Sequence, residues 1–380
     1  MFAGYLIMLE FKKNIKSKTK KLVEFCKKNG HISPTFEDVR DVHSLFSYGH
    51  RATGIMQQMI TNWKNIFIHG RKNHYLINAP CMIAKNILEK SGHLKAFDGT
   101  KDSGLFELLN GKLYLRPETA QMIYHNYKRY KYIYGPTHVM GQIGRAFRFE
   151  KSSQRTCMRC WQFTQMELQI FTRERSLVEM PKLKYCVAVV TDSDKTYLGR
   201  IPSQISKYLK IHDTYMRLCD LKYRLCILEK TLPHYSRFTV DVEVLLDGVW
   251  REMASINDRG FHDNVVMGCK PGDISVIEFS YGLDRLFWAM TMNNFDGQSI
   301  RYPKDCRISG GLLAIHKNAD TPEIAEKYLP RISYKKIVKL SKIKNEKKIL
   351  AYDKYYVAYT NKLEYLDENF NIVHTVKYGQ

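Results

Sequence analysis

The pattern of apolar and polar positions along the chain predicts helices interspersed with strands. Apolar residues recur at helical spacing in some stretches and alternate with polar residues in others. The helical stretches are residues 55–63, 122–132 and 283–292, and the basic stretch 175–235 is predicted to be a helical insertion. The strand-like stretches are residues 75–78, 104–115, 142–150, 159–171, 237–246, 249–253 and 274–279, the second being a hairpin that turns at Asn110-Gly111.

The character of the chain changes after about residue 303. A strand is predicted at 311–316 and a helix at 322–328, and the alternation within 352–378 predicts two or three further strands. A Lys-rich stretch, 332–348, lies between them. The sequence therefore predicts a large domain of residues 1–304 and a small one of residues 305–380.

Two neighbouring strand-like stretches carry charged and aromatic side chains on one face. Arg148 and Glu150 point the same way, because alternate side chains of a strand share a face. Arg159, Phe163 and Glu167 line one face of the next strand. If the two strands pair antiparallel, both sets of side chains lie on one face of the sheet. That face then offers cations that can bind phosphate, a ring that can stack on a base and carboxylates that can bind an amine. The stretch predicts a site for ATP and an ammonium-bearing partner, and a solvated polar hairpin is the alternative.

Composition and charge narrow the function classes. The 380 residues are 44% hydrophobic and 12% aromatic, enough to bury a sizeable core, and no run of 18 apolar residues predicts a membrane span. A cytoplasmic protein is the default expectation. The formal net charge of +22 favours a polyanionic partner such as nucleic acid, although compositional bias toward Lys, Asn, Ile and Tyr explains it equally well.

One pair of the nine cysteines, Cys157 and Cys160, has metal-ligand spacing and falls inside the predicted ATP hairpin. A zinc site needs a second pair or suitable histidines, and the sequence offers no partner pair. A reduced, unligated pair is the preferred interpretation.

The charged hairpin resembles the second signature of the class II aminoacyl-tRNA synthetases, and the surrounding motifs resemble those of glycyl-tRNA synthetases. The resemblance covers about residues 20–295, with the motifs in the family's order. They are Leu-Arg-Pro-Glu-Thr-Ala-Gln at 115–121, Gln-Ile-Gly-Arg-Ala-Phe-Arg-Phe-Glu at 142–150, Phe-Thr-Gln-Met-Glu-Leu at 163–168, Trp-Arg-Glu at 250–252 with Asp258-Arg259 and Asp263, and Ile-Glu-Phe-Ser-Tyr-Gly-Leu-Asp-Arg at 277–285. The triplet Ser91-Gly92-His93 also falls where the family has one.

The resemblance implies an α+β fold, a class II catalytic core with a mainly antiparallel sheet flanked by helices. It also implies a small C-terminal α/β domain, here a reduced anticodon-binding domain, and a homodimer built around residues 48–80. The implied reaction joins glycine to tRNA in two steps through a glycyl-adenylate, with ATP as substrate and Mg²⁺ as cofactor.

The resemblance and the side-chain chemistry together assign roles to individual residues. The ATP-binding candidates are Arg148, Glu150, Arg159, Phe163, Glu278 and Arg285, of which Arg148 and Arg285 are the catalytic candidates. Adenine is expected between Phe163 and Arg285. The amino-acid-binding candidates are Arg116, Glu118, Glu167, Glu252 and Ser280, and Glu278 is the candidate Mg²⁺ ligand. Arg259 and Asp263 either belong to the site or simply brace each other.

The chain departs from the family's pattern at a few positions. Phe149 stands where the family has Asn, Trp161-Gln162 where it has Arg-Glu, Phe279 where it has Pro and Ser255 where it has Gly. None of these removes a charge needed to form an adenylate. The leading hypothesis is a glycine–tRNA ligase. Two alternatives stay open: a silent relative that binds nucleic acid as a polymerase accessory protein, and an amino-acid-activating enzyme that loads an acceptor other than tRNA.

Overall fold

The computed structural model describes residues 18–97, 103–150, 156–316 and 334–378. The chain forms two compact units. The larger comprises Pro34–Ser47 and Ile60–Met290, and the smaller comprises Met1–Ser33, Tyr48–Met59 and Thr291–Gln380. These units do not coincide with the predicted division at residues 304 and 305, which stays a prediction.

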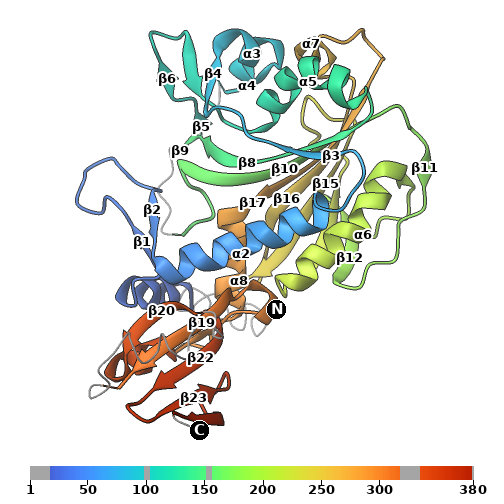
Figure 1. Ribbon diagram of the computed structural model, residues 1–380. Coiled ribbons are helices and arrows are strands. Elements are labelled where there is room, and N and C mark those ends of the chain that lie inside the picture. The colour runs from blue at the N-terminus through green and yellow to red at the C-terminus, as the bar shows by residue number, and fades with distance from the viewer. Residues whose placement is uncertain (1–17, 98–102, 151–155, 317–333, 379–380) are drawn as a thin grey trace, which may run out of the picture. The chain divides into compact units, whose positions relative to one another are not determined.

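The larger unit is built on an eight-stranded sheet in the order β12-β14-β15-β16-β17-β10-β8-β3 (Figure 1). Its strands are β3 (His74–Ile77), β8 (Val139–Phe147), β10 (Gln162–Thr172), β12 (Cys186–Thr191), β14 (Tyr223–Leu228), β15 (Phe238–Leu246), β16 (Val249–Gly260) and β17 (Ser275–Gly282). Only the two edge strands run parallel to their neighbours. The predicted antiparallel core is confirmed.

Residues 18–293 contain further helices and short strands besides this sheet. The helices are α2 (His50–Phe67), α3 (Lys85–Lys90), α4 (His93–Phe97), α5 (Ala120–Tyr134), α6 (Ser203–Leu218), α7 (Asn264–Met267) and α8 (Leu283–Asn293), and residues 18–28 are also helical. The short strands are β1 (Ile32–Pro34), β2 (Phe46–Tyr48), β4 (Met82–Ala84), β5 (Ser103–Gly104), β6 (Glu107–Leu108), β7 (Leu113–Leu115), β9 (Phe149–Glu150), β11 (Leu177–Val178) and β13 (Ile201–Pro202). None of the helices within the described ranges is long and apolar enough to cross a membrane.

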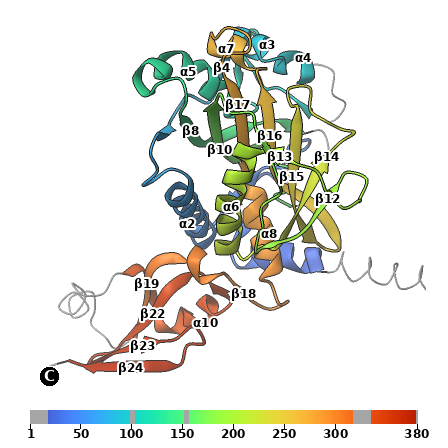
Figure 2. The same cartoon turned by 90° about the vertical axis from the view of Figure 1, so that its right-hand side faces the viewer.

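The side chains of β17 alternate between the two faces of the sheet, one apolar and one polar. The rings of Phe279 and Tyr281 are buried against α6, where Tyr208 packs on Phe279 with ring centroids 5.9 Å apart and His212 Nδ1 lies 2.9 Å from the Tyr281 hydroxyl. Because alternate residues of a strand face opposite ways, Glu278 and Ser280 point to the other face of the sheet. Figure 2 shows α6 lying against the sheet.

The predicted helical insertion at residues 175–235 is wrong. This stretch contains the single helix α6, and its strands β12 and β14 extend the central sheet. The sequences of these two strands, Cys-Val-Ala-Val-Val-Thr and Tyr-Arg-Leu-Cys-Ile-Leu, are short apolar runs without clear alternation. Periodicity alone does not distinguish such runs from buried helix segments.

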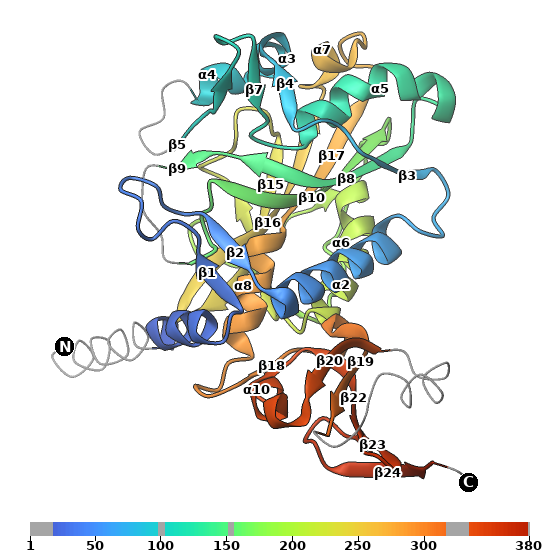
Figure 3. The ribbon, with the colours of Figure 1, turned by 60° about the vertical axis from the view of Figure 1, so that its left-hand side comes forward.

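The C-terminal part of the smaller unit is a five-stranded sheet in the order β20-β19-β22-β23-β24 (Figure 3). The elements of this part of the chain are β18 (Ile300–Arg301), η1 (Lys304–Cys306), β19 (Ile308–Ile315), β20 (Tyr334–Lys339), η3 (Leu340–Lys342), α10 (Ile343–Glu346), β21 (Ile349–Leu350), β22 (Tyr352–Ala358), β23 (Lys362–Leu366) and β24 (Ile372–Lys377). β18 and β21 pair with each other as a separate two-stranded sheet. The strands predicted at 311–316 and within 352–378 are confirmed, and the helix predicted at 322–328 lies outside the described residues.

Candidate active site

A cavity of about 290 Å³ opens on the sheet face opposite α6. Its walls come from strands β10 and β14–β17, from the ends of the hairpin that joins β8 to β10, and from the loop that precedes α5. It brings together every predicted site residue except Arg116: Glu118, Arg148, Glu150, Arg159, Phe163, Glu167, Glu252, Glu278, Ser280 and Arg285. Residues separated by as much as 167 positions in sequence therefore line one cavity.

The floor of the cavity consists of two transverse rows of polar residues. Directly opposed residues of antiparallel neighbours place their side chains on the same face. The first row runs Glu167, Ser280, Ser255 and Asp241, and the second row runs Gln169, Glu278, Asn257 and Thr239. A β-bulge on β16 shifts the pairing with β15 between Val242 and Glu243. Glu252 therefore also reaches the cavity, although it stands three positions from Ser255.

Hydrogen bonds join the two rows to each other. The hydroxyl of Ser255 donates to Asp241 Oδ1 at 3.1 Å, and Asn257 Nδ2 donates to Ser255 Oγ at 3.3 Å and to Glu278 Oε1 at 3.0 Å. Thr239 Oγ1 donates to Asn257 Oδ1 at 2.8 Å. These bonds fix the side chains of the floor before any ligand arrives.

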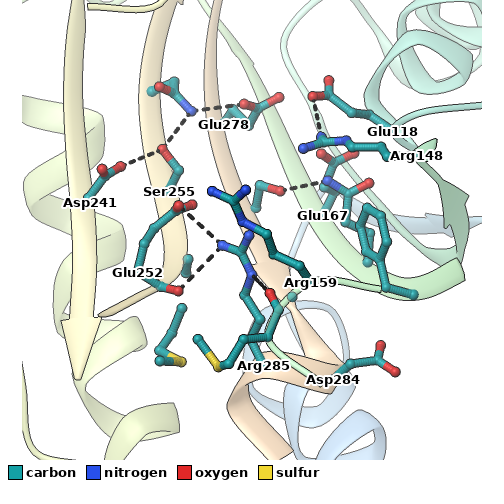
Figure 4. Close-up of a pocket in the computed structure, with 18 of the residues that line it drawn as sticks. Glu118, Arg148, Arg159, Glu167, Asp241, Glu252, Ser255, Glu278, Asp284 and Arg285 are labelled. Carbon is teal, nitrogen blue, oxygen red and sulfur yellow. Dashed lines mark hydrogen bonds and ion pairs between the residues drawn. The ribbon is translucent and has the colours of Figure 1, made fainter. Parts of the chain in front are cut away.

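Each arginine of the cavity is paired with a carboxylate that also lines it. Arg148 Nη2 lies 2.7 Å from Glu118 Oε1, and Arg285 Nη1 lies 3.1 Å from Glu252 Oε2 (Figure 4). A third pair joins Arg159 Nη1 to Glu150 Oε2 at 3.9 Å. The backbone carbonyl of Met158 also accepts from Arg285 Nε at 2.9 Å.

The ring of Phe163 is covered by Arg148, whose guanidinium carbon lies 5.5 Å from the ring centroid. The sequence predicts that Arg285 is the cation opposite this ring. The stacking of adenine between Phe163 and Arg285 therefore stays a prediction, and Arg148 is the cation that the structure brings to the ring.

Three carboxylates, those of Glu118, Glu167 and Glu278, converge at one end of the cavity. Glu167 is only 1% exposed and accepts a hydrogen bond from the Thr119 hydroxyl. Its burial, followed by the charges of Glu278 and Glu118, raises the pKa of Glu167 well above its usual value. Carboxylates crowded in this way favour a cation among them.

Glu278 is the most heavily hydrogen-bonded of the three. It accepts from Gln169 Nε2 at 2.7 Å, Asn257 Nδ2 at 3.0 Å and the Tyr124 hydroxyl at 3.2 Å, and Arg259 Nη1 lies 3.5 Å from both of its oxygens. These donors occupy most of its lone pairs. A carboxylate held in this way does not fit the predicted role of a Mg²⁺ ligand.

Glu118 stays ionised in spite of its burial. Burial favours the neutral form, but His93, then Arg148 and Arg259, hold the pKa of the Glu118 carboxyl well below its usual range. His93 Nε2 lies 3.1 Å from Glu118 Oε2, and Gln121 Nε2 donates to the same oxygen at 3.0 Å.

Arg259 and Asp263 form a buried, two-pronged ion pair behind the carboxylates. Arg259 Nε donates to Asp263 Oδ2 at 2.7 Å and Nη2 donates to Oδ1 at 3.0 Å, with both side chains fully buried. The guanidinium also stacks on the ring of Tyr235 at 4.0 Å. Neither residue lines the cavity, so the bracing interpretation fits their position.

Arg116 lies outside the cavity and binds backbone instead. It is 1% exposed, and its guanidinium donates to the carbonyls of Arg145, Ala79 and Pro80 at 2.7, 2.9 and 3.0 Å. Gly144 leaves room for it, because a Cβ there would lie 2.1 Å from Arg116 Nη2. Arg116 thus fastens the loop that carries Glu118 to β8.

Sequence reasoning did not assign several residues that line or support the site, among them Asp241, Asn257 and His93. Asp241 and Thr239 share a face of one strand, and Asn257 and Ser255 share a face of the next, so alternation offered a signal. Burial, followed by the nearby Glu252, raises the pKa of Asp241 to about 7. Nothing in the local spacing of the sequence indicates the contact of His93 with Glu118.

Cys157 and Cys160 are buried and line the cavity beside the arginines. A hydrogen bond with Cys157, together with burial, raises the pKa of the Cys160 thiol well above its usual value. Within the described part of the chain, no group of three or more His, Cys, Asp or Glu residues is placed to hold a metal ion. The reduced, unligated state of the pair stays a prediction.

The fold defined by these elements is that of the class II aminoacyl-tRNA synthetases. A prolyl-tRNA synthetase from Cryptosporidium parvum, complexed with halofuginone and AMPPNP, matches with a TM-score of 0.63 at 11% identity and covers 94% of this chain and 72% of its own. A Giardia lamblia prolyl-tRNA synthetase in complex with prolyl-adenylate matches with a TM-score of 0.64 at 14% identity, covering 96% and 75%. No family model matches the sequence.

In sequence the chain is similar to glycine–tRNA ligases, as its motifs predict. It is 31% identical to that of Malacoplasma penetrans over 208 residues, half of this chain and 40% of the relative. It is 30% identical to that of Staphylococcus haemolyticus over 234 residues, 56% of this chain and 44% of the relative. A longer match, 367 residues at 23% identity, covers 76% of the Mycoplasmopsis synoviae ligase. The chain thus spans less than half the length of the first two relatives.

Proposed function

We propose that this protein activates glycine with ATP and transfers the glycyl group to tRNA. The observation that carries the proposal is the meeting, in one cavity, of three converging carboxylates with three arginines. The first set suits an ammonium group and the second suits a triphosphate. The class II fold and the similarity to glycine–tRNA ligases support the same chemistry.

The ammonium of the amino acid is assigned to the end of the cavity where Glu118, Glu167 and Glu278 converge. An ammonium has three N–H donors and needs acceptors around it. Glu167 and Glu118 supply charge, while Ser280 and Gln165, joined by a 3.1 Å hydrogen bond, supply polar contacts beside them. Binding a cation here offsets the burial and the charge repulsion that together raise the pKa of Glu167.

The small size of glycine follows from what surrounds this end of the cavity. The two rows of the floor are polar, and Asn257 and Ser255 are already hydrogen-bonded to each other and to their neighbours. An apolar side chain placed over them would cover polar groups without compensating bonds. The site therefore favours an amino acid without a side chain.

The first reaction step needs positioning more than proton transfer. One carboxylate oxygen of glycine attacks the α-phosphorus of ATP, the bond to the bridging oxygen breaks, and pyrophosphate leaves with the bonding electrons. That carboxylate is ionised near neutral pH, so no general base is needed. Arg148, nearest to the carboxylates, is assigned to the α-phosphate, and Arg159 and Arg285 to the outer phosphates.

In the second step, a ribose hydroxyl at the end of tRNA attacks the carbonyl carbon of the adenylate. The hydroxyl loses its proton and AMP leaves with the bonding electrons. The net charge of +22 suits this polyanionic partner. Mg²⁺ is expected to accompany ATP, but Glu278 is not assigned to it, and no other protein ligand is proposed.

A homodimer and a cytoplasmic location complete the proposal. β3 forms one edge of the central sheet, and its Leu76 is 44% exposed, which supports an interface near residues 48–80. Light scattering at micromolar concentration should give twice the mass of the chain, and a monomer would exclude this assembly. Localisation of tagged protein tests the compartment.

ATP–pyrophosphate exchange with each amino acid, followed by transfer to total tRNA, tests the activity. Exchange that depends on glycine, followed by charging of tRNA, is the expected result. Exchange without charging would favour an enzyme that loads another acceptor. Absence of exchange with every amino acid would favour a silent, nucleic-acid-binding relative.

A further inference from the structure

The two oxygens of Glu118 have different partners, and this carries an inference that rests on the proposed function. Oε1 lies 2.7 Å from Arg148 Nη2. Oε2 lies 3.1 Å from His93 Nε2 and 3.0 Å from Gln121 Nε2. One partner, Arg148, is the residue assigned to the α-phosphate of ATP, whereas the others face no substrate group.

While Arg148 and Glu118 are paired, neither charged group is available to a ligand. The Arg148 side chain is 27% exposed and the Glu118 side chain is 14% exposed, so both are within reach of ligands. A phosphate that draws Arg148 away leaves Glu118 Oε1 with an unpaired acceptor beside the proposed ammonium subsite. An ammonium then replaces the cation that has left.

His93, in contrast, is fixed. Its ring is 2% exposed and stacks on Tyr235, with ring centroids 6.0 Å apart and planes 17° apart. Its Nδ1 lies 3.1 Å from both the carbonyl oxygen and the hydroxyl of Ser91, and that hydroxyl donates to the Leu88 carbonyl at 3.1 Å. Polar partners thus hold the ring at both nitrogens, since Gln121 Nε2 also lies 3.0 Å from His93 Nε2.

We propose that His93 is a positioning residue that holds Glu118 in place after ATP has drawn Arg148 away, so that ATP binding opens the ammonium subsite. ATP and glycine then bind with positive coupling. Without ATP, glycine must compete with Arg148 for Glu118. Without His93, Glu118 Oε2 would keep only its bond from Gln121 once Arg148 leaves, and the side chain would be free to turn. By linkage, each ligand raises the affinity for the other by the same factor.

Calorimetric titration of glycine in the absence and presence of α,β-methylene-ATP, which cannot form an adenylate, measures this coupling. We expect glycine to bind about 5- to 150-fold more tightly with the analogue, the usual range of such couplings. Titration of the analogue with and without glycine should give the same factor. A factor of one in the wild-type protein would overturn the inference.

Substitutions at His93 separate positioning from general stability. His93→Ala should bring the coupling factor close to one while the affinity for the analogue alone stays near that of the wild type. His93→Gln, which keeps an N–H donor, should restore part of the coupling. A structural defect would weaken both ligands together, and Asp273→Asn, at an exposed ion pair with Arg173, is the matched control. Full coupling in His93→Ala would refute the positioning role.

Pyrophosphate exchange distinguishes failure of this inference from failure of the proposed function. Glycine-dependent exchange with a coupling factor of one would leave the enzyme assignment intact and remove only the role of His93. No exchange with glycine would remove both.

Discussion

The carboxylate of Glu118 lies 2.7 Å from the guanidinium of Arg148, so the group proposed to bind the ammonium and the group proposed to bind a phosphate neutralise each other. Arg285 and Glu252 stand in the same relation at 3.1 Å. Ion pairs of this kind order the arginines before ATP arrives, which is the preorganisation that electrostatic catalysis needs. They also mean that each substrate must displace a protein group.

Arg148→Ala should abolish pyrophosphate exchange without unfolding the protein. The variant removes the cation assigned to the α-phosphate, and losses of about 100- to 1,000-fold are usual for one preorganised donor. Arg148→Lys, which keeps the charge but not the two-pronged geometry, should recover only part of the rate. Thermal unfolding and the surface variant Arg173→Ala serve as controls. Normal exchange in Arg148→Ala would refute the assignment.

Glycine binding should release protons. Burial, with Glu278 and Glu118, raises the pKa of Glu167, and an ammonium beside it favours its ionised form. Binding therefore lowers this pKa, and glycine affinity should rise with pH. Calorimetry in buffers of different ionisation enthalpy measures the proton count.

Glu167→Gln is the matched variant for this measurement. It keeps the size of the side chain and should bind glycine at least about 30-fold more weakly, since loss of one partner of a buried charge pair costs roughly 2–5 kcal/mol. Proton release attributable to Glu167 should vanish. Equal proton release in the variant and the wild type would contradict this origin.

Asp241→Asn should change how stability depends on pH. Burial and Glu252 raise the pKa of Asp241 in the folded protein from its ordinary 3.8 to about 7. The folded state therefore holds the proton more tightly, so this group's contribution is complete below about pH 4 and is lost as the pH rises to about 7. Relative to Asp241→Asn, the wild type should lose up to about 4 kcal/mol across this range.

Denaturant unfolding at several pH values measures that difference. Glu252→Gln removes the neighbouring charge and should shift the loss to lower pH. The same pH dependence in Asp241→Asn and the wild type would show that another group is responsible.

Gly144→Ala should destabilise the larger unit. The added methyl group would lie 2.1 Å from Arg116 Nη2, and three backbone carbonyls hold that guanidinium in place. Overpacking of this kind costs about 1–3 kcal/mol. Gly104→Ala is the control, because a Cβ there meets Phe149 only at an ordinary 3.7 Å. Equal melting temperatures for the two variants would contradict the explanation.

Local periodicity was enough to predict the chemical centre of the cavity. Strand alternation is a short-range rule, and it predicts that Arg148, Glu150, Phe163 and Glu167 share one floor. The antiparallel pairing of β8 with β10 is confirmed, and all four residues line the cavity, although Arg148 and Glu150 lie beyond the end of β8. The rule failed at β12 and β14, where apolar runs lack alternation. It also gave no information on which strands become neighbours.

The roles of Glu278 and Arg116 depend on partners distant in sequence. The donors to Glu278 come from α5, β10 and β16, and the acceptors of Arg116 lie in β8 and after β3. Only the assembled sheet shows that the first carboxylate is already occupied and that the arginine supports a loop. A sequence motif identifies such residues without revealing what they bind.

The bulge on β16 makes the floor of the cavity sensitive to the number of residues in this strand. The extra residue of the bulge lets the side chains of Glu252 and Ser255 face the same cavity. Deleting that residue would turn Glu252 to the opposite face of the sheet, out of reach of Arg285. A register shift of β17 by one residue would replace Glu278 and Ser280 on the cavity face by the aromatic rings of Phe279 and Tyr281. Substitutions can therefore change this cavity gradually, whereas insertions and deletions in these two strands should disrupt it.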